Sequence, residues 1–220
     1  MKLERNERNM KIAYIFLNGE INGSYEFYKK YIDECVGDIF CADGGLYHVD
    51  KLGLMPIRIS GDFDSVDKNI LEKYKKLNVK IDKFSEEKDK TDGEIILDYV
   101  STLNYDKLYV IGGTGGRTDH LITNLNLIFK YKNIIFLNEN EIIFKINNFY
   151  TLNGYKNYTV SFIPFSENVE ELSLIGFKYP LEKYCLAQES SRCMGNIAIS
   201  DQCKIEFKSG KLLCMIKLNK

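Results

Sequence analysis

The chain has 220 residues, with 30 lysines and arginines against 31 aspartates and glutamates, and a formal net charge of −1. By overall charge this balance excludes a strongly basic nucleic-acid-binding protein, though not a local basic patch, and a content of 45% hydrophobic and 28% charged residues argues against a disordered chain. The longest apolar runs fall well short of the roughly 18 residues that a membrane-spanning helix needs. We therefore expect a globular protein that binds neither nucleic acid nor membrane.

Six cysteines are scattered along the chain, and no two of them form a C-x-x-C pair. This spacing argues against a zinc site. The first ten residues, MKLERNERNM, lack the apolar core of a signal peptide, so a disulfide framework is not expected either. We predict a reduced, cytoplasmic protein.

Short apolar runs alternate with helical patterns over the first two-thirds of the chain. Helices are predicted to begin near Ser24, a potential N-cap, and at Thr91, where Thr91 and Glu94 have the spacing of a capping box. Alternating strands and helices predict a mostly parallel sheet with helices on both faces. The strands are expected at 11–17, 38–42, 56–60, 79–84, 108–111 and 134–137, and the other helices at 69–77 and 121–129.

The pattern changes near residue 145, after an asparagine-rich junction over residues 140–153. Beyond it we predict only short strands, with a two-residue hairpin turn at Ser209-Gly210 between the last two of them. This indicates an α/β domain over residues 1–145 and a smaller antiparallel β-sandwich over residues 146–220. The predicted strands of the second domain are 158–164, 169–175, 196–200, 203–208 and 211–218.

Two aspartates, Asp62 and Asp64, directly follow a predicted strand. Carboxylates two residues apart can converge on a hard cation such as Mg²⁺, which prefers oxygen ligands. Alternatively, both residues only form a turn, and Asp67 completes a helix cap. A second acidic pair, Asp89 and Asp92, lies where the helix after 79–84 begins; it belongs either to the same cation site or to a solvated, charged loop.

The segment Gly112–His120 contains four glycines in five positions and then Arg117, Thr118 and Asp119. Glycines permit positive φ and close backbone approach, the start of the following helix favours anions, and a guanidinium suits phosphate. The segment matches neither the P-loop nor the G-x-G-x-x-G pattern. We favour a phosphate site over the alternative of a tight turn with Asp119 as an N-cap and His120 as a packed ring. His48 lies in a further segment predicted to be helical, after the strand expected at 38–42, and is interpreted as structural.

Taken together, these motifs resemble the thiamine pyrophosphokinase family. The resemblance continues into the second domain and covers nearly the whole chain. It rests on Ala42-Asp43-Gly44-Gly45, Gly61-Asp62-Phe63-Asp64-Ser65, Asp89-Lys90-Thr91-Asp92 and Gly115-Gly116-Arg117-Thr118-Asp119-His120, in that order, followed by Ser161-Phe162-Ile163-Pro164 and Gly176-Phe177-Lys178-Tyr179-Pro180-Leu181.

The resemblance implies transfer of a diphosphoryl group from ATP to thiamine, with Mg²⁺, giving thiamine diphosphate and AMP. It also implies an α/β catalytic domain, a C-terminal vitamin-binding β domain, and a homodimer with active sites at the subunit interface. By match to the motifs, the catalytic residues are Asp62, Asp64, Asp92, Arg117 and Asp119, the Mg²⁺ ligands are Asp62, Asp64, Asp89 and Asp92, and the ligand-binding residues are Asp43, Gly44, Gly115, Gly116, His120 and Asn196.

Two positions depart from the family pattern. Gly195 precedes Asn196 where the family usually has serine, so one hydroxyl that would contact thiamine is missing. Gly93 follows Asp92 where the family commonly has leucine, which weakens the start of that helix by up to about 1 kcal/mol.

Three other classes compete with this interpretation. A metal-dependent phosphatase with Asp62 as nucleophile needs its D-x-D pair after the first strand, whereas here the pair comes after two earlier strands. A non-catalytic sensor of a nucleotide or of thiamine diphosphate has no need for the full set of acidic residues. A purely structural α/β domain leaves the glycine–arginine cluster unexplained.

Overall fold

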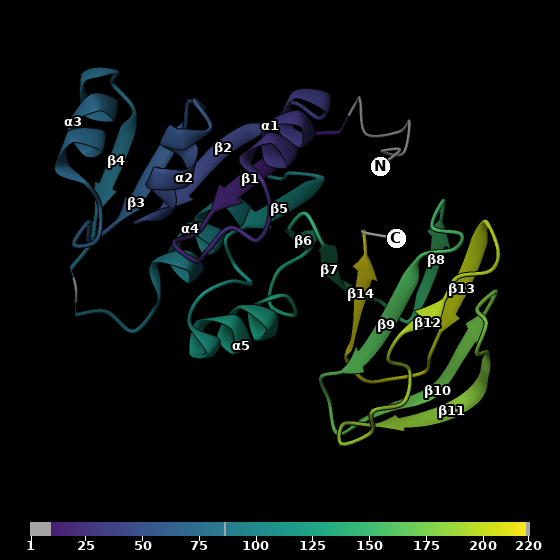
Figure 1. Cartoon of the computed structure of the whole chain (residues 1–220). Coiled ribbons are helices and arrows are strands. Elements are labelled where there is room, and N and C mark those ends of the chain that lie inside the picture. Colours follow the sequence, from purple (N-terminus) through teal and green to yellow (C-terminus); the bar gives the residue numbers. More distant parts are fainter. Residues whose placement is uncertain (1–9, 86, 219–220) are drawn as a thin grey trace. The chain divides into compact units, whose positions relative to one another are not determined.

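The computed structural model describes residues 10–85 and 87–218 (Figure 1). The segment on which we judged the absence of a signal peptide therefore lies largely outside the described residues. The chain forms two compact units, the first ending at Glu139 and the second beginning at Asn140. None of the helices in the described part of the chain has the length and apolar character that crossing a bilayer requires.

The first unit contains a six-stranded, entirely parallel sheet with helices on both faces, as predicted (Figure 1). Its strands lie in the order β6-β5-β1-β2-β3-β4. The strands are β1 (Ile12–Phe16), β2 (Asp38–Ala42), β3 (Arg58–Gly61), β4 (Lys80–Lys83), β5 (Lys107–Ile111) and β6 (Ile134–Leu137); the helices are α1 (Tyr25–Glu34), α2 (Gly45–Lys51), α3 (Lys68–Lys76), α4 (Asp92–Ser101) and α5 (Thr118–Leu127).

The central strands are buried along their whole length, which explains why their sequences are apolar runs rather than alternating patterns. All five residues of β1 are buried, and the ring of Tyr14 stacks on that of Tyr109 in β5, with 5.5 Å between the centroids. The Tyr14 hydroxyl donates a hydrogen bond of 2.6 Å to the carbonyl oxygen of Cys35, which satisfies the polar end of a fully buried ring.

The strand order reverses direction at β1. From β1 the chain adds β2, β3 and β4 on one side, and then crosses back to add β5 and β6 on the other side. Between β1 and β5, successive connections therefore leave the sheet in opposite directions and open a crevice at the carboxyl ends of the strands. In open α/β sheets this is where ligands bind.

Side-chain caps begin three of the helices, as their sequences predict. Ser24 accepts a hydrogen bond from the backbone N–H of Phe27 (3.2 Å), and Thr91 accepts one from that of Glu94 (3.1 Å). Asp67 caps α3 through the N–H of Asn69. The Thr91 cap fixes where α4 begins and so places Asp92 at the edge of the sheet.

Gly93 lies in the first turn of α4 without a requirement for glycine. A Cβ atom added there would meet the side chain of Leu17 at 3.4 Å, an ordinary van der Waals contact. We predict that Gly93→Ala raises the free energy of unfolding by roughly 0.5–1 kcal/mol, because alanine loses less backbone freedom on folding. Urea unfolding followed by circular dichroism measures this change, and a destabilised variant would contradict the prediction.

An ion cluster holds the far end of α4 against the segment after α5. The Asp98 carboxylate accepts hydrogen bonds from Lys130 Nζ (2.7 Å), Lys90 Nζ (2.9 Å) and the Tyr131 hydroxyl (2.8 Å). Partial burial of Asp98 opposes its charge, but these three donors outweigh that cost and lower its pKa to about 2.

This low pKa predicts a pH-dependent contribution to stability. Because the folded-state pKa lies below the unfolded value of about 3.9, the contribution is complete above that value and is lost as pH falls toward 2. Asp98→Asn is expected to lower the free energy of unfolding by about 1 kcal/mol at pH 7, after allowance for solvent screening, and by almost nothing near pH 2. Urea unfolding at several pH values tests this, with the exposed Asp33→Asn as a control; a difference independent of pH would contradict it.

The second unit is a sandwich of two antiparallel sheets, as predicted. Within this unit the strands are ordered β12-β9-β14-β7 in one sheet and β11-β10-β13-β8 in the other. Alternate residues of β9, among them Val160 and Phe162, are buried between the sheets. The strands are β7 (Glu141–Ile146), β8 (Phe149–Asn153), β9 (Thr159–Pro164), β10 (Asn168–Ile175), β11 (Leu181–Ala187), β12 (Asn196–Ile197), β13 (Gln202–Glu206) and β14 (Leu212–Lys217).

The predicted hairpin at Ser209-Gly210 is wrong. The two strands that flank it belong to different sheets: β13 pairs with β10 and β8, whereas β14 pairs with β7 and β9. Gly210, with a φ of 112°, instead lies where the chain crosses between the sheets. The expected junction at 140–153 is also structured, because β7 and β8 occupy most of it, and residue 145 lies within β7.

Candidate active site

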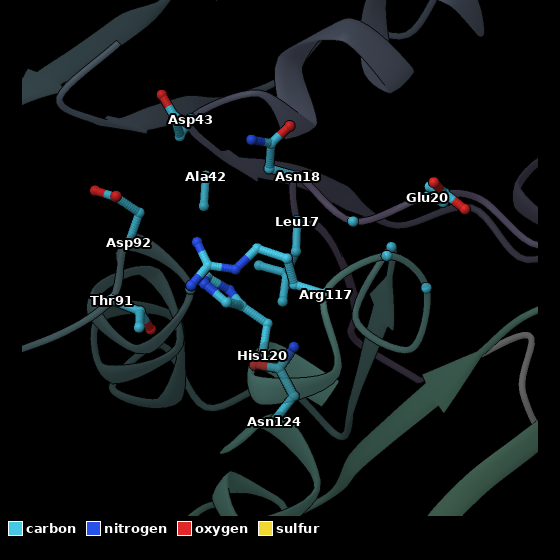
Figure 2. A pocket seen from close by; sticks show the side chains of 15 residues that line it. Leu17, Asn18, Glu20, Ala42, Asp43, Thr91, Asp92, Arg117, His120 and Asn124 are labelled. Atoms are coloured by element: carbon cyan, nitrogen blue, oxygen red, sulfur yellow. The ribbon is translucent and has the colours of Figure 1, made fainter. Parts of the chain in front are cut away.

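A cavity of about 500 Å³ opens at the carboxyl ends of the parallel strands (Figure 2). Its lining comes from the segments that follow β1, β2 and β5 and from the first turn of α4, which is the position that the strand order predicts. The lining residues are Leu17, Asn18, Gly19, Glu20, Ala42, Asp43, Thr91, Asp92, Gly93, Gly112, Gly115, Gly116, Arg117, His120 and Asn124.

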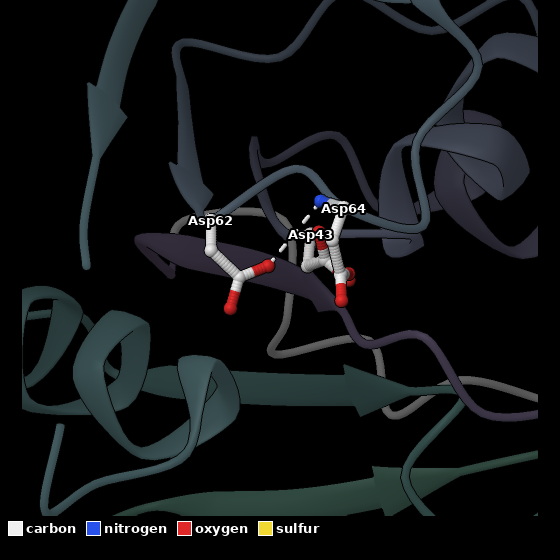
Figure 3. Close-up of side chains that lie close together, drawn as sticks. All are labelled: Asp43, Asp62 and Asp64. Atoms are coloured by element: carbon white, nitrogen blue, oxygen red, sulfur yellow. Dashed lines mark hydrogen bonds between the residues drawn. The ribbon is translucent and has the colours of Figure 1, made fainter. Parts of the chain in front are cut away.

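Three carboxylates converge beside this cavity. One oxygen atom from each of Asp43, Asp62 and Asp64 lies within 4.8 Å of the others (Figure 3). Parallel pairing of β2 with β3 aligns Ala42 with Ser60, so the residues that follow both strands leave the sheet side by side. Sequence analysis assigned Asp43 to ligand binding and did not include it among the metal ligands.

Unusual backbone conformations place these carboxylates. Asp43 has a φ of 45° and Phe63 a φ of 64°, in the left-handed region that bulky side chains rarely adopt. The turn at Phe63 brings Asp62 and Asp64 to one side, and the Asp64 backbone N–H donates to Asp62 Oδ1 at 3.3 Å (Figure 3). Strain of this kind persists where the surrounding structure enforces it, and it clusters at functional sites.

The environment of Asp43 suits a bound cation. Its Oδ2 accepts a hydrogen bond from the Ser65 hydroxyl, whereas its Oδ1 is buried and has no hydrogen-bond partner in the described structure. A buried carboxylate oxygen without a donor is costly unless something else compensates its charge. Because the nearby ligand atoms are all carboxylate oxygens, the residues present fit a hard divalent ion such as Mg²⁺.

Lys88 links this triad to a fourth carboxylate. Its Nζ donates to Asp62 Oδ2 (3.0 Å) and to Asp92 Oδ1 (2.8 Å). The hydrogen bond from Lys88 lowers the pKa of Asp62, whereas burial raises the pKa of Asp92 despite the same partner. Of the predicted metal ligands, Asp62 and Asp64 thus lie in the triad and Asp92 joins it through Lys88, while Asp89 is exposed and outside the group.

Glycines allow the loop after β5 to pack closely against the loop after β1. A Cβ atom on Gly19 would lie 2.2 Å from the carbonyl oxygen of Gly112, and one on Gly115 would lie 2.3 Å from that of Glu20. The Gly19 N–H donates to the Gly112 carbonyl at 3.0 Å. Gly112 and Gly116 also have positive φ, of 73° and 85°. Part of the glycine richness is therefore explained by packing inside the protein, with Gly116 left facing more open space.

The charged residues that follow this loop lie at the start of α5. Arg117 is the N-cap residue, so Asp119 falls in the first turn and is not the cap. Two hydrogen bonds from the Arg117 guanidinium, at 2.6 and 3.1 Å, are the main cause that lowers the pKa of Asp119 to about 2. Figure 2 shows Arg117 and His120 reaching into the cavity. Asn124, deeper in α5, donates to the Gly113 carbonyl (2.8 Å) and braces the loop.

Two protein-family models match this chain. The family model described as the catalytic domain of thiamin pyrophosphokinase matches residues 28–137, and the model of its vitamin B1 binding domain matches residues 147–212. The chain belongs to the thiamin pyrophosphokinase family.

Two bacterial members of the family are similar to this chain over most of their length. The thiamine pyrophosphokinase of Bacillus subtilis (strain 168) is 32% identical over 181 residues, which cover 80% of this chain and 84% of that protein. The crystal structure of the Bacillus subtilis protein covers 96% of this chain and 100% of its own, with a TM-score of 0.84 and 27% identity. The crystal structure of the Geobacillus thermodenitrificans protein covers 95% of this chain and 98% of its own, with a TM-score of 0.83 and 28% identity.

Several residues that line the cavity, Asn18 among them, were not expected from the sequence, whereas His48, interpreted as structural, does not line it. Asn18 lines the cavity and donates to Ser65 Oγ (3.3 Å), which in turn donates to Asp43. His48 is buried, and its ring nitrogens contact the Tyr25 hydroxyl (2.8 Å) and the Gly19 carbonyl (2.9 Å), which ties α2 to the loop after β1. Asn18-Gly19 has the composition of a turn, yet its place directly after an apolar strand is the same signal that marked the aspartates.

The segment matching the family's vitamin-binding domain has a cavity of its own, of about 310 Å³. Asn196 lies in its lining, but its side chain is engaged by backbone: Oδ1 accepts from the N–H groups of Tyr179 and Ile197, and Nδ2 donates to the Tyr179 carbonyl. Gly195 has a φ of 66°, which favours glycine over serine at this position. Its N–H donates to Ser161 Oγ at 2.9 Å, so a hydroxyl from another strand lies beside it.

Proposed function

We propose that the chain is a thiamine diphosphokinase, which transfers a diphosphoryl group from ATP to the hydroxyl of thiamine and releases AMP. The observation that carries this proposal is the acidic triad, with its buried and unpartnered Asp43 oxygen, beside a glycine-lined cavity at the reversal of strand order. Membership of the thiamin pyrophosphokinase family supports the reaction and both substrates.

The acidic residues give the site its electrostatic character. Asp43, Asp62 and Asp64 would hold Mg²⁺, which when bound offsets the negative charge of the phosphate oxygens. In the reaction the thiamine hydroxyl oxygen forms a bond to the β-phosphorus of ATP, and the bond from that phosphorus to the oxygen bridging to the α-phosphorus breaks. Such chemistry needs positioning and charge neutralisation more than covalent help.

The other residues of the cavity bind and orient the reactants. The backbone of Gly115 and Gly116, in the loop just before α5, would cradle the polyphosphate, and Arg117 would supply a guanidinium beside it. Asp119 holds this guanidinium in place through two hydrogen bonds. Asp92 lines the cavity, which makes it one of the carboxylates that could accept the hydroxyl proton.

We further propose that the active molecule is a cytoplasmic homodimer with its active sites at the subunit interface, as the family resemblance implies. The cavity lined by Tyr179 and Asn196 would then contribute to thiamine binding, although the amide of Asn196 serves mainly to shape the loop around it. Light scattering coupled to size exclusion measures the molar mass in solution; a mass of one 25.5 kDa chain would contradict the dimer.

The proposal is tested by incubating the purified protein with ATP, Mg²⁺ and thiamine and separating the products by chromatography. We expect AMP and thiamine diphosphate in equal amounts, and AMP only when thiamine is present. Release of inorganic phosphate from ATP without thiamine would instead indicate a phosphatase, and binding of ATP or thiamine diphosphate without turnover would indicate a sensor.

A further inference from the structure

Lys88 occupies a distinctive position between the acidic groups of the site. Its ammonium group bridges Asp62 and Asp92 at 3.0 and 2.8 Å, and the three side chains are largely shielded, with 17%, 15% and 20% of their surfaces exposed. Asp62 is at the same time a member of the triad with Asp43 and Asp64. One carboxylate is therefore shared between the candidate cation site and the lysine.

The charged groups are arranged as in a two-metal site in which the Lys88 ammonium group stands in place of one of the two ions. Enzymes with two divalent ions hold them about 3.5–4 Å apart and clamp the attacking and leaving oxygens between them. Here Asp62 has the place of the bridging carboxylate, Asp43 and Asp64 complete one cation position, and Asp92 would be the outer ligand of the second. An ammonium group is a compact point charge with three donors, and it fills that second position.

Resting on the function proposed above, we propose that Lys88 is a built-in second cation. It limits the site to a single divalent ion, held by Asp43, Asp62 and Asp64, and it presents its charge to the polyphosphate from the side of Asp92. Two of its three N–H donors bond to Asp62 and Asp92; the third has no partner among the described residues and would donate to a phosphate oxygen. Lys88 is thus a binding residue for the substrate as well as a regulator of metal stoichiometry.

Metal counting tests this role without relying on turnover. The full-length protein is titrated with Mn²⁺, and free Mn²⁺ is measured by electron paramagnetic resonance. We expect about one tightly bound Mn²⁺ per chain for the wild type and about two for Lys88→Met, because the freed carboxylates of Asp62 and Asp92 then have no counter-charge. Lys88→Arg, which keeps the positive charge, is expected to retain the single ion.

Lys90→Met is the matched control. It removes a lysine two positions away that pairs with Asp98 rather than with the triad, and it should leave the Mn²⁺ count unchanged. Two tight ions in the wild type, or an unaltered count and affinity in Lys88→Met, would overturn the proposal. Circular dichroism verifies that each variant is folded, and Lys88→Gln carries the same test if the methionine variant is not.

Two separate measurements distinguish the role of Lys88 from the proposed diphosphokinase activity. Mn²⁺ binding is measured in the absence of ATP and thiamine, whereas thiamine-dependent AMP formation is assayed separately on the wild type. Suppose that the wild type binds one Mn²⁺ and Lys88→Met binds two, but the wild type forms no AMP. This result would support the role of Lys88 in metal stoichiometry and would contradict only the proposed diphosphokinase activity.

Discussion

Asp64→Asn is expected to lower kcat/KM for thiamine diphosphate formation by at least about a hundredfold, which corresponds to roughly 3 kcal/mol of transition-state stabilisation. Asparagine keeps the shape of the side chain but removes one of the three negative charges that would hold the divalent ion. Asp64 is exposed, and its loss relieves repulsion from Asp43 and Asp62, so the fold should be unaffected. Steady-state kinetics and the thermal midpoint measure the two effects.

The matched control for this variant is Asp67→Asn. Asp67 lies three residues further along the chain, outside the triad, and caps α3 through the N–H of Asn69. Asparagine is an equally good N-cap residue, so this variant removes a nearby carboxylate while preserving the local structure. It should keep near-normal activity. Near-normal activity in Asp64→Asn as well would show that the triad is not the metal site.

Gly19→Ala is expected to have the largest effect on stability among the substitutions considered. The added Cβ atom would lie 2.2 Å from the Gly112 carbonyl oxygen and 2.7 Å from that of Gly115, and backbone atoms cannot move away as a flexible side chain could. The loops after β1 and β5 must therefore separate, at a cost of about 1–3 kcal/mol. Because both loops line the cavity, activity should fall together with stability.

Comparison with Gly93→Ala makes this prediction specific. The two substitutions add the same methyl group to glycines that line one cavity, yet the structure predicts opposite signs, since the new atom meets backbone oxygens at position 19 and only the Leu17 side chain at position 93. Urea unfolding of both variants measures the difference. A Gly19→Ala variant as stable as the wild type would contradict the close packing of the two loops.

The strands and helices of the first unit were predictable because local signals dominate there. Buried parallel strands are apolar runs, as β2 and β6 show, and Ser24 and Thr91 begin their helices with side-chain caps that depend on neighbouring residues alone. The gathering of candidate site residues at one edge of the sheet was equally predictable, because all parallel strands present their carboxyl ends at one edge.

The features that were missed depend on pairing between distant segments. Nothing in the sequence around Ser209-Gly210 indicates that β13 and β14 belong to different sheets. Asp43 joins Asp62 and Asp64 only because β2 and β3 are adjacent, a fact that strand order rather than any motif determines. The bridge from Lys88 to Asp62 spans 26 residues and likewise requires the folded chain.

Anomalous diffraction from crystals grown with Mn²⁺ would show whether the three carboxylates hold a divalent ion, since manganese takes the oxygen ligands that suit Mg²⁺ and its position can be located without reference to any assay. We expect one strong peak per chain within bonding distance of carboxylate oxygens of Asp43, Asp62 and Asp64. A strong peak elsewhere in the chain, with these three carboxylates left without an ion, would contradict it.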